Sequence, residues 1–126
     1  MTTPARILCV DDDPRILELN QIVLGRAGYE VALASSPEEA LEHLKSGSFD
    51  LVITDLFSAG SSDVEFIAKM RGIVPRLPII VVSGNHNPPA EVLKLTNAFI
   101  AKAYTVNALT DAVREVLMRE NTRRIG

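Results

Sequence analysis

The chain has 126 residues, of which 47% are hydrophobic and 23% charged, values typical of one soluble globular domain. Its formal net charge of -3 gives no electrostatic case for a protein that binds nucleic acid directly or adheres to anionic membranes. The only cysteine, Cys9, cannot form an internal disulfide, and the first apolar run is too short for a signal peptide or a membrane span. We therefore expect a cytoplasmic protein.

The first expected element is a buried strand that is followed directly by a helix. Residues 7–10 form a short, fully apolar run that ends at three aspartates, and such a run fits a parallel strand covered on both faces. Pro14 then favours the start of a helix, because a first helical turn does not need the N–H that proline lacks. Apolar residues recur at helical spacing after it, and Gly28 is suited to end the helix.

A strand, a helix and a further strand follow. Residues 29–34 predict a strand. Ser36 offers a capping hydroxyl for a helix that starts with a proline and two acids and ends at Gly47. The third strand covers residues 51–54 and stops at Asp55. Strand and helix therefore alternate through the first half of the chain.

The second half of the chain continues this alternation. The expected elements are a helix that ends near Gly72, a strand at residues 79–82, a short helix from Asn87 and Pro88 to about Thr96, a strand at residues 98–101, and a last helix that ends near residue 120. The apolar residues of the last helix again recur at helical spacing. We expect the tail at residues 121–126 to be frayed.

Five short strands alternating with five helices predict an α/β fold with a doubly wound parallel sheet, because the connecting helices cover both faces of such a sheet. Neither an internal repeat nor a linker interrupts the pattern. We therefore expect one domain over residues 1–126, with a core from about residue 5 to residue 120. In open sheets of this kind, ligands bind outside the carboxyl ends of the strands.

Polar side chains follow four of the five strands at that edge. They are Asp11, Asp12 and Asp13 after the first strand, Asp55 after the third, Ser83 after the fourth and Lys102 after the fifth. Clustered carboxylates repel one another unless a cation lies among them, and oxygen ligands with room for water and phosphate suit Mg²⁺. A carboxylate beside Mg²⁺ can attack a phosphoryl group, while the metal and an ammonium group neutralise the transferring oxygens. The pattern therefore favours phosphoryl transfer to an aspartate.

Four segments resemble the receiver domains of bacterial two-component response regulators, the chemotaxis regulators among them. These segments are residues 7–14, 50–56, 82–84 and 99–102, and they occur in the family's order with nearly its spacing. The resemblance covers almost the whole chain. It implies a flavodoxin-like (βα)5 three-layer sandwich with strand order 2-1-3-4-5, which agrees with the alternation of strands and helices.

The resemblance also assigns roles to single residues: Asp55 as the phosphoryl acceptor; Asp11, Asp12, Asp55 and the backbone carbonyl of Phe57 as ligands of Mg²⁺; Ser83 and Lys102 at the phosphoryl group; and Ser83 with Phe99 as the switch. The phosphoryl donor would be a histidine kinase or a histidine phosphotransfer protein, and a downstream protein or output domain would respond to the switch. The family is one of signalling proteins and not of enzymes, since its chemistry is confined to its own phosphorylation and dephosphorylation. A dimer that forms on phosphorylation is an option that the resemblance leaves open.

The chain departs from the family in several places. Ala103 stands where the family has a proline, often after a cis bond; because a cis bond before another residue type costs ~2.5–4 kcal/mol, we expect a trans bond there. Residues 58–59 replace a Met-Pro pair, and Asp63 replaces a common glycine, which predicts a looser loop and a weaker affinity for phosphate. The segment from Ser83 to Lys102 is shorter than usual, which changes the expected partner surface.

Phe57 lies two residues past the acceptor, and Asn85 two residues past Ser83. In the family these two positions influence how water reaches the phosphoryl group. We hypothesise that the bulky, apolar Phe57 slows hydrolysis, so that Phe57→Asn shortens the lifetime of the phosphorylated protein. Timing the release of phosphate tests this hypothesis, and an unchanged lifetime would count against it.

Other interpretations of the same residues stay open at this point. Asp12 or Asp13 could be an ordinary helix N-cap beside Pro14. A pseudo-receiver, which binds partners without being phosphorylated, has the same fold. A phosphatase of the haloacid dehalogenase type would use Asp11 as the nucleophile, but it needs a later acidic pair at a strand end, which we do not find. Replacing Asp55 by asparagine separates the receiver from this phosphatase.

Overall fold

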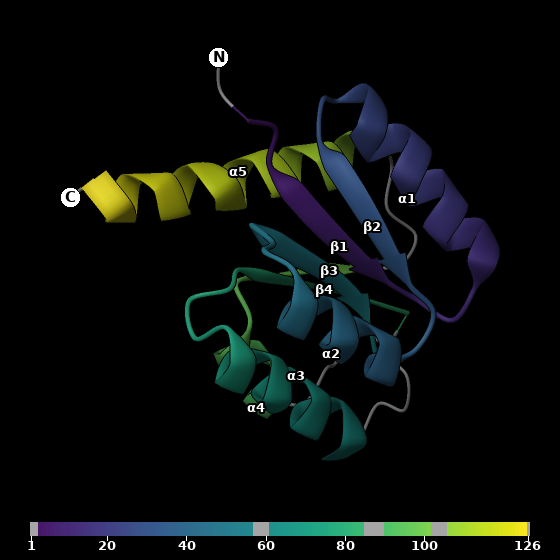
Figure 1. Ribbon diagram of the computed structural model, residues 1–126, viewed down its shortest axis with the longest axis vertical. Coiled ribbons are helices and arrows are strands. Elements are labelled where there is room, and N and C mark those ends of the chain that lie inside the picture. The colour runs from purple at the N-terminus through teal and green to yellow at the C-terminus, as the bar shows by residue number, and fades with distance from the viewer. Residues whose placement is uncertain (1–2, 57–60, 85–89, 102–105, 126) are drawn as a thin grey trace.

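Five parallel strands form the centre of the molecule (Figure 1). The computed structural model describes residues 3–56, 61–84, 90–101 and 106–125. The strands are β1 (Arg6–Val10), β2 (Glu30–Ala34), β3 (Leu51–Asp55), β4 (Ile79–Ser83) and β5 (Ala98–Ala101). Their order in the sheet is β2-β1-β3-β4-β5, and every neighbouring pair is parallel, as the resemblance implied.

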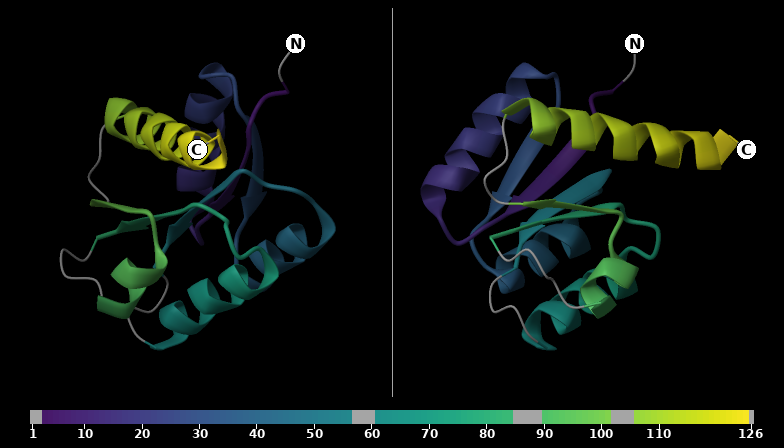
Figure 2. Two further views of the ribbon diagram at one scale, coloured as in Figure 1. Left: turned by 90° about the vertical axis from the view of Figure 1, so that its left-hand side faces the viewer. Right: turned by 180° about the vertical axis from the view of Figure 1, so that it is seen from behind.

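Helices cover both faces of the sheet and give the molecule three layers (Figures 1 and 2). They are α1 (Pro14–Arg26), α2 (Pro37–Ser46), α3 (Ser61–Ile73), α4 (Ala90–Leu95) and α5 (Val106–Ile125). On one face α1 and α5 pack against side chains such as Ile53 and Ile80. On the other face α2, α3 and α4 pack against Val52 and Val81. This arrangement confirms the predicted doubly wound α/β fold.

Burial on both faces explains why residues 7–10 of β1 are all apolar. Successive side chains of a strand point to opposite faces, and in β1 Ile7 and Cys9 join one apolar cluster while Leu8 and Val10 join the other. None of these four side chains is more than 2% exposed. A strand with one face exposed to solvent would instead alternate between apolar and polar residues.

The end of α1 follows from one glycine. Gly28 has a φ of +98°, a backbone conformation that side chains disfavour. In this conformation the N–H of Gly28 donates to the carbonyl of Gly25 at 3.1 Å, and the N–H of Tyr29 donates to the carbonyl of Leu24 at 3.1 Å. These two hydrogen bonds satisfy carbonyl groups at the helix end and turn the chain toward β2.

The start of α2 agrees with its predicted cap. The Ser36 hydroxyl accepts a hydrogen bond from the N–H of Glu39 at 3.2 Å, and Pro37 occupies the first helical turn. Glu38 and Glu39 lie in that turn, where the helix dipole favours negative charge. The helix ends at Ser46, directly before Gly47.

Two helices differ in length from the expected ones. α5 continues to Ile125, past the expected end near residue 120. No glycine or proline interrupts residues 106–125, and an ion pair between Glu115 and Arg119 supports the helix at the favourable spacing of four residues. α4 covers only Ala90–Leu95; its expected start at residues 87–88 lies outside the described residues.

Truncating a buried side chain of β4 is expected to destabilise the fold strongly. Ile80 is 0% exposed and lies between β3 and β5. Ile80→Ala should lower the free energy of unfolding by about 2–5 kcal/mol, because it removes apolar contacts and leaves a cavity. Leu19→Ala is the control, since Leu19 is 49% exposed and its loss should change stability by only about 0.5 kcal/mol. Urea denaturation measures both, and equal effects would contradict the assigned core.

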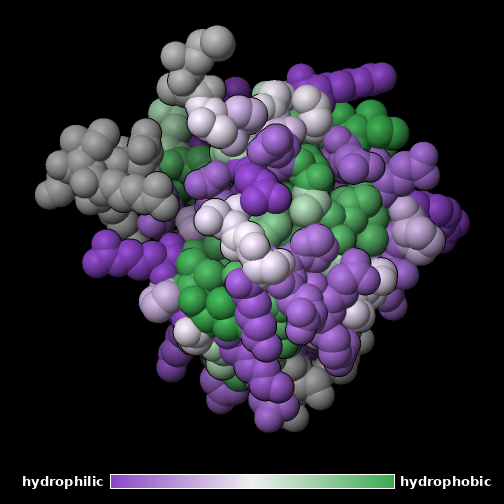
Figure 3. Space-filling view, viewed as in Figure 1, coloured by the Kyte–Doolittle hydropathy of each residue, from purple (hydrophilic) through white to green (hydrophobic). Residues whose placement is uncertain are grey.

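The surface is mostly hydrophilic, with apolar residues scattered among polar ones on the face in Figure 3. In the described ranges the large apolar side chains that are exposed lie on three helices: Leu19 and Ile22 on α1, Leu93 on α4 and Met118 on α5. No helix within those ranges is long and apolar enough to span a lipid bilayer.

Candidate functional site

The parallel register brings the ends of three strands to one edge of the sheet. Val10 of β1 lies opposite Thr54 of β3, so the next residues, Asp11 and Asp55, are neighbours across the two strands. Ser83, the last residue of β4, follows the residue that lies opposite Asp55. The convergence that the sequence predicted at the carboxyl edge is therefore present for these residues.

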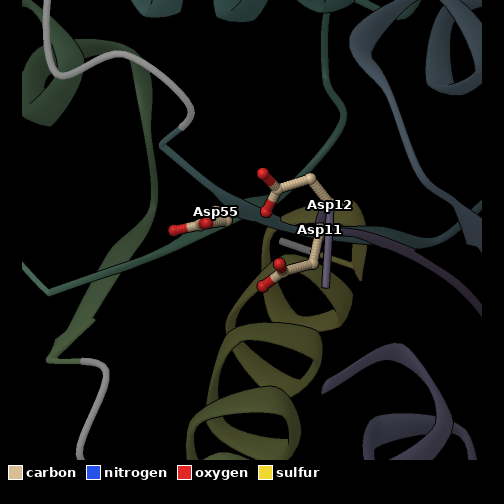
Figure 4. Close-up of side chains that lie close together, drawn as sticks. All are labelled: Asp11, Asp12 and Asp55. Atoms are coloured by element: carbon tan, nitrogen blue, oxygen red, sulfur yellow. The ribbon is translucent and has the colours of Figure 1, made fainter. Parts of the chain in front are cut away.

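Three carboxylates gather at this edge, with Asp11 and Asp12 following β1 and Asp55 ending β3 (Figure 4). One oxygen of each lies within 4.8 Å of the others. Asp11 is 3% exposed and Asp55 is 8% exposed, whereas Asp12 is exposed to solvent. The group therefore combines two buried acids with one that faces water.

The spacing of these oxygens suits one divalent cation. Oxygen ligands lie about 2.1 Å from Mg²⁺, so ligands on opposite sides of the ion are about 4.2 Å apart. The observed limit of 4.8 Å is close to that separation, and small side-chain rotations close the difference. All three donors are carboxylate oxygens, which Mg²⁺ prefers, and the exposed side at Asp12 leaves room for water.

Backbone hydrogen bonds fix Asp11 in the loop after β1. Its N–H donates to the carbonyl of Ala34 at the end of β2, at 3.1 Å. Its Oδ1 accepts from the N–H of Asp13 at 2.9 Å. A carboxylate held in this way is oriented before any ion arrives, which reduces the entropy lost on binding.

Asp13 is the N-cap of α1 and is not a member of the carboxylate group. Its Oδ1 accepts from the backbone N–H of Arg15 at 3.0 Å, and its side chain also pairs with the Arg15 guanidinium. The hydrogen bond to the Asp13 carboxylate, and then its negative charge, raise the pKa of Arg15. The interpretation as a helix N-cap is therefore correct for Asp13, whereas Asp11 and Asp12 belong to the group of three carboxylates with Asp55.

Two hydrogen bonds place the end of β3. The N–H of Leu56 donates to Oδ1 of Asp55 at 2.9 Å. The hydroxyl of Thr54, whose residue is 0% exposed, donates to the backbone carbonyl of Asp55 at 2.9 Å. Thr54 therefore holds the peptide unit that carries the acidic side chain. Sequence reasoning placed Thr54 only in a strand; the signal available was a hydroxyl residue at the end of an otherwise apolar run.

Removing the Thr54 hydroxyl should disturb Asp55 without changing the size of the side chain. Thr54→Val is expected to lower the free energy of unfolding by about 1 kcal/mol and to slow the phosphorylation that the family resemblance predicts for Asp55, because the backbone carbonyl loses its donor. Thr54→Ser keeps the hydroxyl and should recover the phosphorylation rate. The time course of the mass change with acetyl phosphate measures both variants. Equal rates in the two would show that the hydroxyl does not position Asp55.

Ser83 and Phe99 are buried to different degrees near this edge. Ser83 is 4% exposed at the end of β4. Phe99 of β5 is partly buried and packs on the apolar cluster that α2, α3 and α4 cover. Packing of this kind agrees with an ordinary core role, and the switching role of Phe99 stays a prediction.

Several predicted residues lie outside the described part of the chain. They are Phe57, Lys102 and the departures at Ser58, Ala59, Asn85 and Ala103. Their assigned roles, and the expected trans bond before Ala103, stay predictions.

Two other residues singled out by the sequence are buried. Asp63 is 3% exposed in the first turn of α3, and within the described ranges the acids that could share one ion are Asp11, Asp12 and Asp55. Cys9 is 0% exposed, and burial raises the pKa of its thiol to about 12. A neutral, buried thiol is unreactive, so Cys9 is a structural residue of β1.

Comparison with known proteins decides the family. A family model described as the response regulator receiver domain matches residues 7–114. The chain belongs to the response regulator receiver domain family. This receiver domain therefore has the family's fold, and its carboxylate group lies at the carboxyl edge of the sheet, where the resemblance placed the family's acidic residues.

Solved receiver domains have the same structure along nearly their whole length. A CheY-like receiver domain protein from Methanospirillum hungatei superposes with a TM-score of 0.89 at 27% identity, covering 96% of this chain and 99% of that one. The response regulator TrrA from Thermotoga maritima, solved in complex with Mg²⁺ and BeF, gives a TM-score of 0.79 at 31% identity, covering 89% and 98%.

Curated relatives extend well beyond this receiver domain. The transcriptional regulatory protein GlrR from Escherichia coli is 32% identical over 117 residues, which cover 90% of this chain and 26% of GlrR. The sensor kinase/phosphatase CqsS from Vibrio cholerae is 32% identical over 114 residues, which cover 86% of this chain and 17% of CqsS. The chain thus spans about a quarter or less of these two proteins.

Proposed function

We propose that this receiver domain accepts a phosphoryl group on Asp55 from the phosphohistidine of a histidine kinase or histidine phosphotransfer protein, with Mg²⁺ held by Asp11, Asp12 and Asp55. The observation that carries the proposal is that oxygens of these three carboxylates lie within 4.8 Å of one another. The complex of TrrA with Mg²⁺ and BeF supports it, because TrrA is 31% identical to this chain.

Different residues of the chain have different roles in phosphoryl transfer. A carboxylate oxygen of Asp55 attacks phosphorus and forms an aspartyl phosphate, while the imidazole of the donor leaves. The Leu56 N–H holds Oδ1 of Asp55, so the side chain keeps one orientation during the attack. Asp11 and Asp12 supply negative charge that would repel a phosphoryl group on its own. Bound Mg²⁺ would neutralise that charge and the charge on the phosphoryl oxygens.

The remaining roles follow from the family resemblance. We assign the backbone carbonyl of Phe57 to the metal, the Lys102 amine and the Ser83 hydroxyl to the phosphoryl oxygens, and Phe99 to the switch. Burial of Ser83 at the end of β4 supports its part of this assignment, because a hydroxyl at the strand end lies at the edge that Asp55 shares.

Phosphorylation would shift the domain between two conformations that bind partners differently. The receiver family is one of signalling proteins, and the match to the sensor kinase CqsS supports a kinase-type partner in general. GlrR, of which the chain spans 26%, supports an output region as the downstream element. We therefore propose a signalling role in a two-component system or phosphorelay.

Incubation with acetyl phosphate and Mg²⁺, followed by measurement of the intact mass, tests the proposal. We expect the mass of one added phosphoryl group with Mg²⁺ and none when a chelator removes the metal. A protein that stays unmodified with Mg²⁺ present would instead be a pseudo-receiver. Modification that is independent of the metal would contradict the assigned role of the carboxylate group.

A further inference from the structure

A cavity of about 500 Å³ lies at the end of the sheet opposite the carboxylate group. It is bounded by the end of α3, the turn into β4, the end of α4 and the second half of α5: Arg71, Pro75, Arg76, Lys94, Leu95, Asn97 and Glu120. Figure 2 shows α5 continuing beyond the sheet on the side where β4 and β5 begin. The volume is within the range of sites that bind small molecules.

Arg71 forms one wall of the cavity and is fixed in place. Its Nε donates to the carbonyl of Leu95 at 2.8 Å, its Nη1 to the carbonyl of Leu77 at 2.6 Å and its Nη2 to Oδ1 of Asn97 at 3.0 Å. All three acceptors are neutral. Burial lowers the pKa of Arg71, and the nearby Glu120 partly offsets this effect, but an arginine stays charged in a protein.

Asn97, which lies directly beside Arg71, is also fixed by hydrogen bonds. Its Oδ1 also accepts from the N–H of Ile79 at 2.9 Å, and its own N–H donates to the carbonyl of Ile79 at 2.8 Å. Its Nδ2 donates to Oε1 of Glu120 at 3.5 Å. The part of the cavity formed by Arg71 and Asn97 is therefore fixed by hydrogen bonds.

The charges at the cavity do not balance. Arg71, Arg76 and Lys94 line it together with one carboxylate, Glu120. Arg76 and Lys94 are exposed, and neither forms an ion pair with another residue in the described ranges. This positive excess lies on a chain whose formal net charge is -3.

The helix ends explain only part of this charge. Arg71 and Lys94 lie in the last turns of α3 and α4, where carbonyl groups favour cations. Arg71 already donates to the last residue of α4 and to Leu77 before β4. Arg76 lies outside α3, which ends at Ile73, so a helix end does not account for it. The charge of Arg76 is thus not explained by a helix end, and it adds to the charges of Arg71 and Lys94 at the same cavity.

We propose that this cavity binds a small anion with one or more phosphate groups, whose oxygens contact Arg76 and Lys94 beside the fixed guanidinium of Arg71. Guanidinium groups bind phosphate through paired hydrogen bonds, and an ammonium group adds a point charge. A cavity of about 500 Å³ has room for a nucleotide as well as for pyrophosphate. The site lies at the opposite edge from Asp55, so both can be occupied at once.

Titration calorimetry with ADP, pyrophosphate and adenosine tests the proposal. Pyrophosphate and ADP are both expected to bind and adenosine is not; tighter binding of ADP would identify a nucleotide site, and equal binding a site for the phosphates alone. The double variant Arg76→Ala/Lys94→Ala should weaken binding at least about tenfold, because two charged contacts are lost. Both residues are exposed, so the fold should be unaffected.

A matched control is available at the ends of two other helices. Arg26 and Lys45 are exposed in the last turns of α1 and α2 and line no part of the cavity. Arg26→Ala/Lys45→Ala removes the same two kinds of charge and should leave the affinity within about twofold. Equal weakening in both double variants would overturn the proposal. So would the absence of binding by ADP and pyrophosphate, or adenosine binding as tightly as ADP.

Discussion

Asp55→Asn is expected to abolish phosphorylation of this receiver domain by acetyl phosphate. An amide oxygen carries no full negative charge and is a far weaker nucleophile than a carboxylate, so no acyl phosphate should form. The replacement has nearly the shape of the original side chain, and its amide oxygen can still accept from the Leu56 N–H that holds Oδ1. The fold should therefore survive, and circular dichroism checks this. Intact mass with and without Mg²⁺ gives the result directly.

Asp13→Asn is the matched control for this experiment. It removes one negative charge from the neighbouring loop, and asparagine serves as an N-cap as well as aspartate does, so the bond from the Arg15 N–H is kept. The control should still be phosphorylated. Phosphorylation of the Asp55→Asn protein on Asp11 would instead support a phosphatase of the haloacid dehalogenase type. Loss in both variants would mean that the charge of the loop matters more than the nucleophile.

Much of this fold could be predicted because both faces of the sheet are buried. Runs such as residues 79–82 have no polar position, and the structure leaves none of them more than 4% exposed. Helix ends were predictable where one residue type has a specific conformational role, as Gly28 and Ser36 have. The strand order required the family resemblance, since alternation of strands and helices alone allows more than one order.

The features that were not predicted have two causes: one helix end was placed too early, and some contacts join residues that no sequence pattern relates. α5 was expected to end near residue 120, yet nothing in residues 121–125 stops a helix, and it continues to Ile125. The hydroxyl of Thr54 was overlooked because its acceptor is a backbone carbonyl, which every residue has. The hydrogen bonds of Arg71 join it to residues up to 26 positions away in the chain, and no local sequence pattern indicates them.

The acidic group was predictable for a different reason. Asp55 lies more than forty positions after Asp11 and Asp12 in the sequence, but the parallel strands that carry these residues end at one edge of the sheet. The sheet topology therefore determines that these three side chains come together, and the residue types determine which chemistry they can perform. The sequence left the cap of α1 open between Asp12 and Asp13, and the structure shows that Asp13 is the cap and that its N–H donates to Asp11.

Asp12→Asn is expected to weaken the binding of Mg²⁺ by about a hundredfold and, in the absence of the metal, to stabilise the fold slightly. The loss of affinity follows from removing a charged oxygen ligand, since even partners outside the ligand shell contribute about ten- to a hundredfold. The gain in stability arises because the three carboxylates lie within 4.8 Å of one another and repel. Asp12 is exposed, so water screens this repulsion, and we expect the gain to be about 1 kcal/mol or less.

The two effects have opposite signs, which distinguishes a metal site from an ordinary acidic surface. Urea denaturation in a chelator should show the Asp12→Asn protein as the more stable one, and the order should reverse at millimolar Mg²⁺, because only the original protein gains stability from binding. Glu18→Gln removes a negative charge from an exposed position of α1. Its stability should follow that of the original protein both in chelator and at millimolar Mg²⁺. If Mg²⁺ stabilised the original and the Asp12→Asn proteins equally, Asp12 would not be a ligand.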